Sequence, residues 1–194
     1  MLETEEQRPG RNKETQINKT YINSGSYKRK FDLITDSPEL SRLLYHLSKK
    51  MLLHRSGTRY EDMYWINLDT DSVIAEEINC TSEKRVEYSE KTIRAINSCS
   101  NILTIHSHPD SFPPSIDDIN SNFLHQYVAG IVVGHDGKVY LYSANEAVNT
   151  RYYQLIVEEN LKSGYNETEA QVGALKKLTE CFSITFKEVT DNGI

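Results

Sequence analysis

Two histidines one residue apart, followed closely by an aspartate, are the residues of this chain best suited to chemistry. His106 and His108 lie in a His-Ser-His-Pro segment, and Asp118 ends the segment Ser-Ile-Asp-Asp. Two imidazoles and one carboxylate can hold a zinc ion and leave its fourth position open, which is the composition of a catalytic rather than a structural zinc site. The sequence therefore predicts a Zn²⁺ centre with His106, His108 and Asp118 as its ligands.

The two histidines require an element that turns both side chains the same way. The segment 101–105, Asn-Ile-Leu-Thr-Ile, is typical of a short buried strand that runs directly into them. Side chains alternate between the faces of a strand, so His106 and His108 are expected on one face and Ser107 on the other. A single ion could then be bound by both rings from one side of the sheet.

The aspartate must reach the histidines from a second element. Pro113 and Pro114 disfavour both helix and sheet pairing, so an extended loop is expected after the strand. Ser115 is a favourable N-cap for a helix whose apolar residues follow at helical spacing. Asp118 would lie in the first turn and point back to the histidines, while Asp117, about 100° further round the helix, is the competing ligand. Ser115 and Asp118 could also form only a capping box, with Asp in place of Glu.

The pattern of His106, Ser107, His108 and Pro109 followed by Ser115-x-x-Asp118 resembles the signature of the JAMM/MPN+ metalloproteases, also called JAB or Mov34 domains. The resemblance covers roughly residues 37–145, and its shortened loop before Ser115 is similar to that of bacterial and phage-associated members. It implies an α/β fold with a mixed β-sheet flanked by helices. It also implies zinc-dependent hydrolysis of amide bonds, often the isopeptide bond between a ubiquitin-like C-terminus and lysine.

The family also has a glutamate that serves as general base, on the first core strand after the first helix. Here a helix is expected to begin with Ser37 as N-cap and Pro38 at its first position, and a strand is expected over residues 60–67. The resemblance therefore implies that Glu61 is the base, which takes a proton from the attacking water and passes it to the leaving amine. Glu76 and Glu77, on the next expected strand, are the alternatives.

Ser115 has two expected roles that are compatible with each other. The resemblance implies that its hydroxyl stabilises the tetrahedral oxyanion by hydrogen bonding. The residue type alone predicts a helix N-cap. The zinc itself would lower the pKa of its bound water to near 7 and polarise the scissile carbonyl.

The chain is predicted to have three parts. Residues 1–26 are polar and are expected to form a disordered tail, residues 27–145 the JAMM-like core, and residues 146–194 a helical extension with a final strand. Within the core, Asp136-Gly137 between two apolar segments predicts a β-hairpin. His135 is therefore expected to be a turn residue and not a metal ligand.

Composition excludes several function classes. The formal net charge of −6 is unlike that of a nucleic-acid-binding protein, and no apolar run is long enough to cross a membrane. Cys80, Cys99 and Cys181 are odd in number and lack a C-x-x-C spacing, as expected for reduced thiols in a cytoplasmic protein. The expected partner is a peptide or ubiquitin-like protein substrate.

Two other functions remain open from the sequence. Family relatives exist that keep the fold without the metal ligands, so a non-catalytic scaffold is one alternative. A processing or docking domain in a phage or mobile-element assembly is another. The presence of His106, His108 and Asp118 favours the hydrolase.

Overall fold

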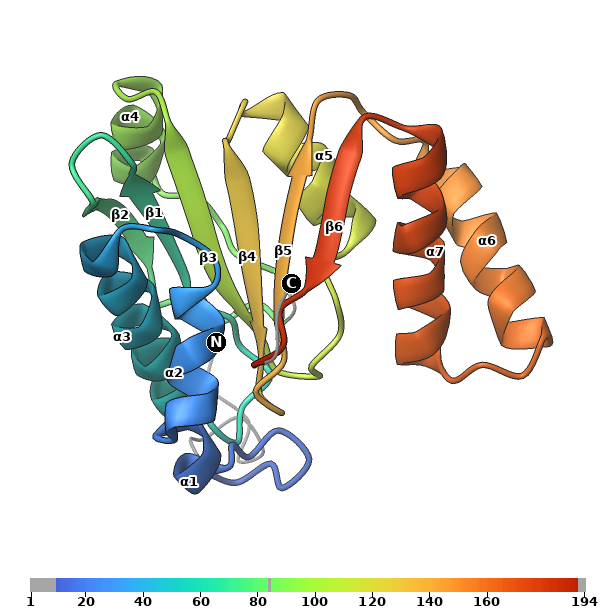
Figure 1. Cartoon of the computed structure of the whole chain (residues 1–194), viewed down its shortest axis with the longest axis horizontal. Helices are drawn as coiled ribbons and strands as arrows, with labels where there is room; N and C mark the ends of the chain where they lie inside the picture. Colours follow the sequence, from blue (N-terminus) through green and yellow to red (C-terminus); the bar gives the residue numbers. More distant parts are fainter. Residues whose placement is uncertain (1–9, 84, 192–194) are drawn as a thin grey trace.

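One mixed β-sheet forms the centre of the computed structural model, which describes residues 10–83 and 85–191 (Figure 1). The strands follow the order β2-β1-β3-β4-β5-β6; β3 and β4 are parallel and the other neighbours antiparallel. Their bounds are β1 Met63–Asn67, β2 Ser72–Glu77, β3 Ile102–His108, β4 Ala129–Gly134, β5 Val139–Ala144 and β6 Ile184–Glu188. The predicted α/β fold with a mixed sheet flanked by helices is confirmed.

Helices cover both faces of this sheet. One face carries α1 (Lys19–Ile22), α2 (Gly25–Asp32) and α3 (Pro38–Arg55), and the other carries α4 (Glu90–Asn97) and α5 (Ile116–Leu124). A hairpin of α6 (Thr150–Lys162) and α7 (Glu167–Cys181) lies beside β6, at the right of Figure 1. Among the described helices, none has the length and apolar character needed to cross a membrane.

The alternation of side chains sorts the core into two faces. In β1, Tyr64 and Ile66 join the apolar cluster beneath α3, whereas Met63 and Trp65 join the cluster beneath α4. In β3, Ile105 belongs to the α3 cluster. Because successive residues of a strand face opposite ways, His106 and His108 face the α4 and α5 side of the sheet.

The start of β1 differs from the expected strand over residues 60–67. The ladder begins at Met63, and Glu61 lies just before it. The reason is that the backbone N–H of Asp62 donates to the Ser107 hydroxyl, at 3.1 Å, instead of to a backbone carbonyl. A side-chain acceptor thus replaces the next ladder bond, and neither residue type reveals this in the sequence.

The expectation of a disordered tail is wrong for residues 10–26, and residues 1–9 lie outside the described part of the chain. The segment contains α1 and the first residues of α2, and Ile17 and Ile22 are buried against α2 and α3. A single helical turn such as α1 buries only Ile22, so no hydrophobic period is visible in the sequence. The segment is therefore part of the core, and the boundary expected at residue 27 falls inside α2.

The last part of the chain completes the sheet. The predicted final strand is present as β6, which pairs with β5, and the predicted helices are α6 and α7. Ala174, Leu175 and Leu178 of α7 are buried in one cluster with Val132 of β4 and Tyr140 of β5. Residues 146–191 are therefore continuous with the core and not a separate extension.

The predicted hairpin is formed by β4 and β5, which pair in antiparallel register around Asp136 and Gly137. Gly137 has a φ of +86°, a conformation that favours glycine. His135 lies in this turn, is buried, and faces the Thr15 carbonyl through Nδ1 at 2.6 Å. It is not part of the group of potential metal ligands formed by His106, His108 and Asp118.

Candidate metal centre

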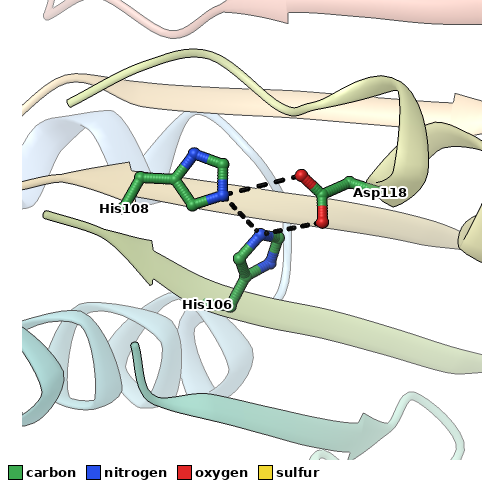
Figure 2. Close-up of side chains that lie close together, drawn as sticks. All are labelled: His106, His108 and Asp118. Carbon is green, nitrogen blue, oxygen red and sulfur yellow. Dashed lines mark hydrogen bonds and ion pairs between the residues drawn. The ribbon is translucent and has the colours of Figure 1, made fainter. Parts of the chain in front are cut away.

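The three predicted ligands come together from two elements that are adjacent in the sequence and joined by a loop, which begins with a turn at residues 109–110 and not with extended chain as expected. His106 and His108 belong to the C-terminal end of β3, and Asp118 lies in the first turn of α5. Their side chains point toward one another from the strand and the helix (Figure 2). One ligand atom from each residue lies within 4.8 Å of the others, so the group could bind a metal ion.

The ligand atoms of the three residues lie close enough together for a single metal ion to bind all of them. The two Nε2 atoms of His106 and His108 are 3.0 Å apart. His106 Nε2 is 3.4 Å from Asp118 Oδ1, and His108 Nε2 is 3.5 Å from Asp118 Oδ2. Bonds of about 2.0–2.2 Å to a tetrahedral zinc give ligand–ligand separations of about 3.3–3.6 Å. The three residues therefore surround a position that could hold one metal ion.

The outer nitrogen of His108 fixes the ring in the state needed for metal binding. His108 Nδ1 lies 3.0 Å from the Phe112 carbonyl oxygen, which can only accept a hydrogen bond. Nδ1 must then carry the proton, and in the neutral ring Nε2 keeps its lone pair for the ion. His106 Nδ1 is buried and has no hydrogen-bond partner among the described residues.

Asp118 is oriented by the capping box at the start of α5. Ser115 donates to Asp118 Oδ2 from both its backbone N–H and its hydroxyl, each at 2.7 Å, and the Asp118 N–H donates to the Ser115 hydroxyl at 3.1 Å. Burial raises the pKa of Asp118, but His106, His108 and Ser115 together hold that pKa well below its ordinary value. The carboxylate is therefore ionised and fixed, with Oδ1 facing His106.

Ser115 was expected to act as a helix N-cap and to stabilise an oxyanion through its hydroxyl. Its N-cap role is confirmed, because the side chain accepts from the Asp118 N–H. Its hydroxyl donates to Asp118 in this structure, so stabilisation of an oxyanion would require the O–H to turn toward the substrate. The competing ligand Asp117 is exposed and lies outside the group of three, although it borders the neighbouring cavity.

Glu61 lies in the same site as the ligands. Its side chain is only 7% exposed, and it lines two cavities that also contain Ser115 and Asp118. Met63 pairs with His106 across β1 and β3, so the same register, continued by two residues, sets Glu61 opposite His108. The hydrogen bond from the Ser107 N–H to the Asp62 carbonyl, at 3.0 Å, shows that the pairing does continue beyond Met63.

The alternative glutamates have other partners. Glu76 forms an ion pair with Lys50 at 3.5 Å, and both side chains are substantially exposed. Glu77 accepts hydrogen bonds from the Ser89 backbone N–H, at 2.8 Å, and the Thr92 hydroxyl, at 2.5 Å, at the start of α4. Neither glutamate lines the two cavities at the ligands. The structure thus brings Glu61, and not its alternatives, to the candidate metal centre.

The site lies where two cavities meet. The larger, of about 560 Å³, is bordered by His106, and the smaller, of about 190 Å³, by His108. The sequence did not indicate the remaining walls of the larger cavity, which come from five separate segments and include Arg85, Tyr88, Thr104, Asn122, Tyr127 and Tyr142. They share no spacing or motif, because only the tertiary fold brings them together.

No protein-family model, curated protein or solved structure matches this chain in the comparisons with known proteins. The resemblance to the JAMM/MPN+ metalloproteases therefore rests on the motif of His106, His108, Ser115 and Asp118. What the structure adds is independent of that resemblance. These residues and Glu61 form one site at the junction of β1, β3 and α5, able to bind a metal ion.

Proposed function

We propose that this chain is a zinc-dependent metalloprotease or isopeptidase of the JAMM type. The observation that carries the proposal is the combination of three potential metal ligands, with one ligand atom of each within 4.8 Å of the others, and a buried glutamate in the same cavities. A structural zinc site would use four protein ligands, whereas three leave a position for the reaction. A site that only stabilised the fold would also have no need for an adjacent carboxylate.

Each residue has a distinct task in this proposal. When bound, zinc lowers the pKa of a coordinated water to about 7 and polarises the scissile carbonyl. His106, His108 and Asp118 hold the ion. Glu61 removes a proton from the nucleophilic water and delivers it to the leaving amine. Ser115 keeps Asp118 in place and lies close enough to the site for its hydroxyl to turn toward a developing oxyanion.

The paired cavities support a substrate that extends to both sides of the metal. The two cavities share Glu61, Ser115 and Asp118, so a bond held at the ligands would have one flanking group in each. A peptide, or a ubiquitin-like tail joined to a lysine, has this form. The larger cavity would take the bulkier flanking group.

The proposal is tested by incubating the zinc-loaded protein with a mixture of linear peptides and lysine-isopeptide-linked peptides, with products identified by mass spectrometry. We expect cleavage that stops when zinc is removed by a chelator and returns when zinc is restored. A His108→Ala variant should remain inactive at every zinc concentration that restores the wild type. A zinc-loaded wild type that cleaves neither class of peptide would favour the non-catalytic scaffold.

A further inference from the structure

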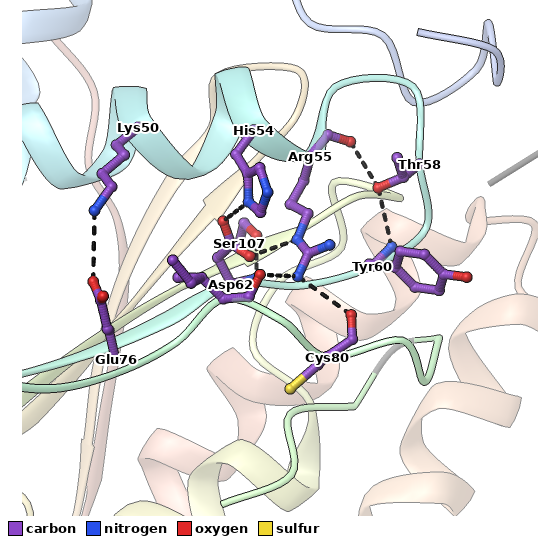
Figure 3. A network of polar contacts seen from close by, with 10 residues as sticks. Lys50, His54, Arg55, Thr58, Tyr60, Asp62, Glu76, Cys80 and Ser107 are labelled. Atoms are coloured by element: carbon purple, nitrogen blue, oxygen red, sulfur yellow. Dashed lines mark hydrogen bonds and ion pairs between the residues drawn. The ribbon is translucent and has the colours of Figure 1, made fainter. Parts of the chain in front are cut away.

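A buried charged network lies directly behind the candidate base. Arg55, the last residue of α3, donates from Nε to Asp62 Oδ1 at 2.5 Å, and His54 Nδ1 lies 2.7 Å from Asp62 Oδ2 (Figure 3). Asp62 is 1% exposed and Arg55 is 7% exposed. Neither residue takes part in the chemistry proposed above, so the network requires another explanation.

Stability alone is a weak explanation for this pair. Moving two charges out of water costs about as much as their attraction returns, and apolar replacements of buried pairs are often neutral. Burial in fact raises the pKa of Asp62 above its ordinary value, despite the hydrogen bonds from His54 and Arg55 that oppose the shift. A pair that is costly to bury and makes this many directed contacts is suited to fixing a position.

Asp62 transmits that position to the site. It follows Glu61 directly and faces α3, while Glu61 faces the metal ligands, as alternation along an extended chain requires. Ser107 donates its backbone N–H to the Asp62 carbonyl at 3.0 Å, and its hydroxyl accepts from the Asp62 N–H at 3.1 Å. Ser107 stands between His106 and His108 in the sequence. The two hydrogen bonds between Asp62 and Ser107 therefore fix the backbone beside Glu61 relative to both histidines.

Arg55 also binds the start of the segment that follows β2. Its Nη2 donates to the backbone carbonyls of Ile78, at 2.7 Å, and Cys80, at 3.2 Å. These residues begin the segment that follows β2 and leads to Arg85 and Tyr88, which border the larger cavity. A single guanidinium therefore connects the residue beside Glu61 with the start of that segment.

We propose that Arg55 and Asp62 are positioning residues, which fix Glu61 and the segment after β2 relative to the metal ligands. This inference rests on the proposed hydrolase function. Without the network, Glu61 would still be present, but its carboxylate would sample positions away from the metal. A misplacement of about 1 Å can cost about 100-fold in rate, so loss of the pair should lower turnover. Metal binding should be unaffected, because neither Arg55 nor Asp62 is a candidate ligand.

The test compares variants on the same helix. Arg55→Lys keeps the positive charge but loses the guanidinium group, whose Nε and Nη2 together bind Asp62, Ile78 and Cys80. Arg42→Lys is the matched control, because Arg42 lies on the exposed surface of α3 in an ion pair with Glu39 at 3.2 Å. A double variant, Arg55→Met/Asp62→Asn, removes both charges of the buried pair and provides the test if Arg55→Lys does not fold.

Kinetics on the peptides cleaved by the wild type give the first measurement. We expect Arg55→Lys and the double variant to lower kcat by about 10- to 100-fold, with KM and zinc content unchanged and Arg42→Lys equal to wild type. A kcat within about twofold of wild type in both folded variants would overturn the proposal. So would a loss explained entirely by a loss of zinc.

Hydrogen exchange separates this inference from the hydrolase proposal, because it needs no substrate. In Arg55→Lys, the amides of residues 59–64 should exchange faster than in wild type, whereas those of β4 and β5 should be unchanged. If wild type cleaves no peptide but this local effect is present, the hydrolase proposal fails, while the finding that Arg55 fixes residues 59–64 stands. Unchanged exchange in residues 59–64 would overturn the positioning role itself.

Discussion

Met63 of β1 pairs with His106 of β3, and this register brings the residues just before β1 beside the metal ligands. Glu61 consequently reaches the site from a chain segment that is far from the histidines in sequence. The pairing also sends Asp62 to the opposite face, toward Arg55. The relative positions of the candidate base and of the two histidines are thus set by one antiparallel ladder, and the first turn of α5 adds Asp118.

Replacing Glu61 by Gln should separate chemistry from metal binding. The amide cannot accept a proton, so the rate of peptide hydrolysis should fall by about 10²- to 10⁴-fold while the zinc content stays at the wild-type value. Glu76→Gln serves as the control, since Glu76 pairs with Lys50 away from the cavities. Hydrolysis that survives in Glu61→Gln and disappears in Glu76→Gln or Glu77→Gln would assign the base to β2 instead.

Ser115→Ala should weaken both the helix start and the metal site. It removes one of the two donors to Asp118 Oδ2, the hydroxyl, and the acceptor for the Asp118 N–H, while the Ser115 backbone N–H still donates to Oδ2. We expect the free energy of unfolding of the metal-free protein to fall by about 1 kcal/mol. Zinc affinity, measured by competition with a chelator, should fall by about 10- to 100-fold, as is usual when a partner of a ligand is lost.

Ser115→Thr is the matched variant, because it keeps the hydroxyl and should retain most of both quantities. Wild-type zinc affinity in Ser115→Ala would show that Asp118 is oriented without the capping box.

Glu77 should make the stability of the fold sensitive to acid. Burial raises its pKa, but hydrogen bonds from Ser89 and Thr92 outweigh burial and hold the pKa below its ordinary value of 4.5. A carboxylate with a depressed folded pKa contributes stability that is complete above the unfolded pKa and is lost as pH falls through the folded pKa. In Glu77→Gln, unfolding by urea should therefore depend less on pH below about 4.5 than in wild type.

Glu76→Gln is again the comparison for this experiment, performed on metal-free protein so that ligand protonation at the metal does not contribute. An equal pH dependence in wild type and Glu77→Gln would remove Glu77 from the explanation of acid sensitivity.

The grouping of His106, His108 and Asp118 could be predicted from the sequence because local rules determine the directions of their side chains. Alternation along β3 sets the two histidines on one face, and the N-cap Ser115 sets Asp118 in the first turn of α5. Glu61 could be proposed only through the family resemblance, because its place depends on pairing between β1 and β3. The roles of Arg55 and Asp62 were not indicated, since their contacts link a helix end, a strand start and a distant loop.

The difference between local signals and tertiary contacts also explains why residues 10–26 were wrongly expected to be disordered. The start of helix α3 was predicted from Ser37 and Pro38, which are local signals, and the helix carries a long apolar stripe that includes Leu40, Leu44, Leu47 and Met51. The start of the chain lacks such a stripe, and its burial depends on single residues such as Ile17 and Ile22 that meet α2 and α3. Short elements of this kind are specified by tertiary contacts and leave little periodicity in the sequence.

Ile22→Ala should show that the first described residues belong to the core. Ile22 is 0% exposed, and truncating a buried isoleucine costs about 2–5 kcal/mol in the free energy of unfolding. Leu124→Ala removes an aliphatic side chain that is 74% exposed and should change stability by less than about 0.5 kcal/mol. Equal, small losses of the free energy of unfolding in both variants, measured by urea denaturation, would show that this segment does not contribute to the core.

The most direct test of the account is the zinc content of the protein. Elemental analysis would be performed on chain purified without a metal-chelating tag, for the wild type beside a His106→Ala/His108→Ala double variant. The account predicts about one zinc per wild-type chain and none in the double variant, because three ligands hold a single ion. A wild type that contains no zinc, even after zinc is supplied, would contradict the account and leave a fold without a metal-dependent reaction.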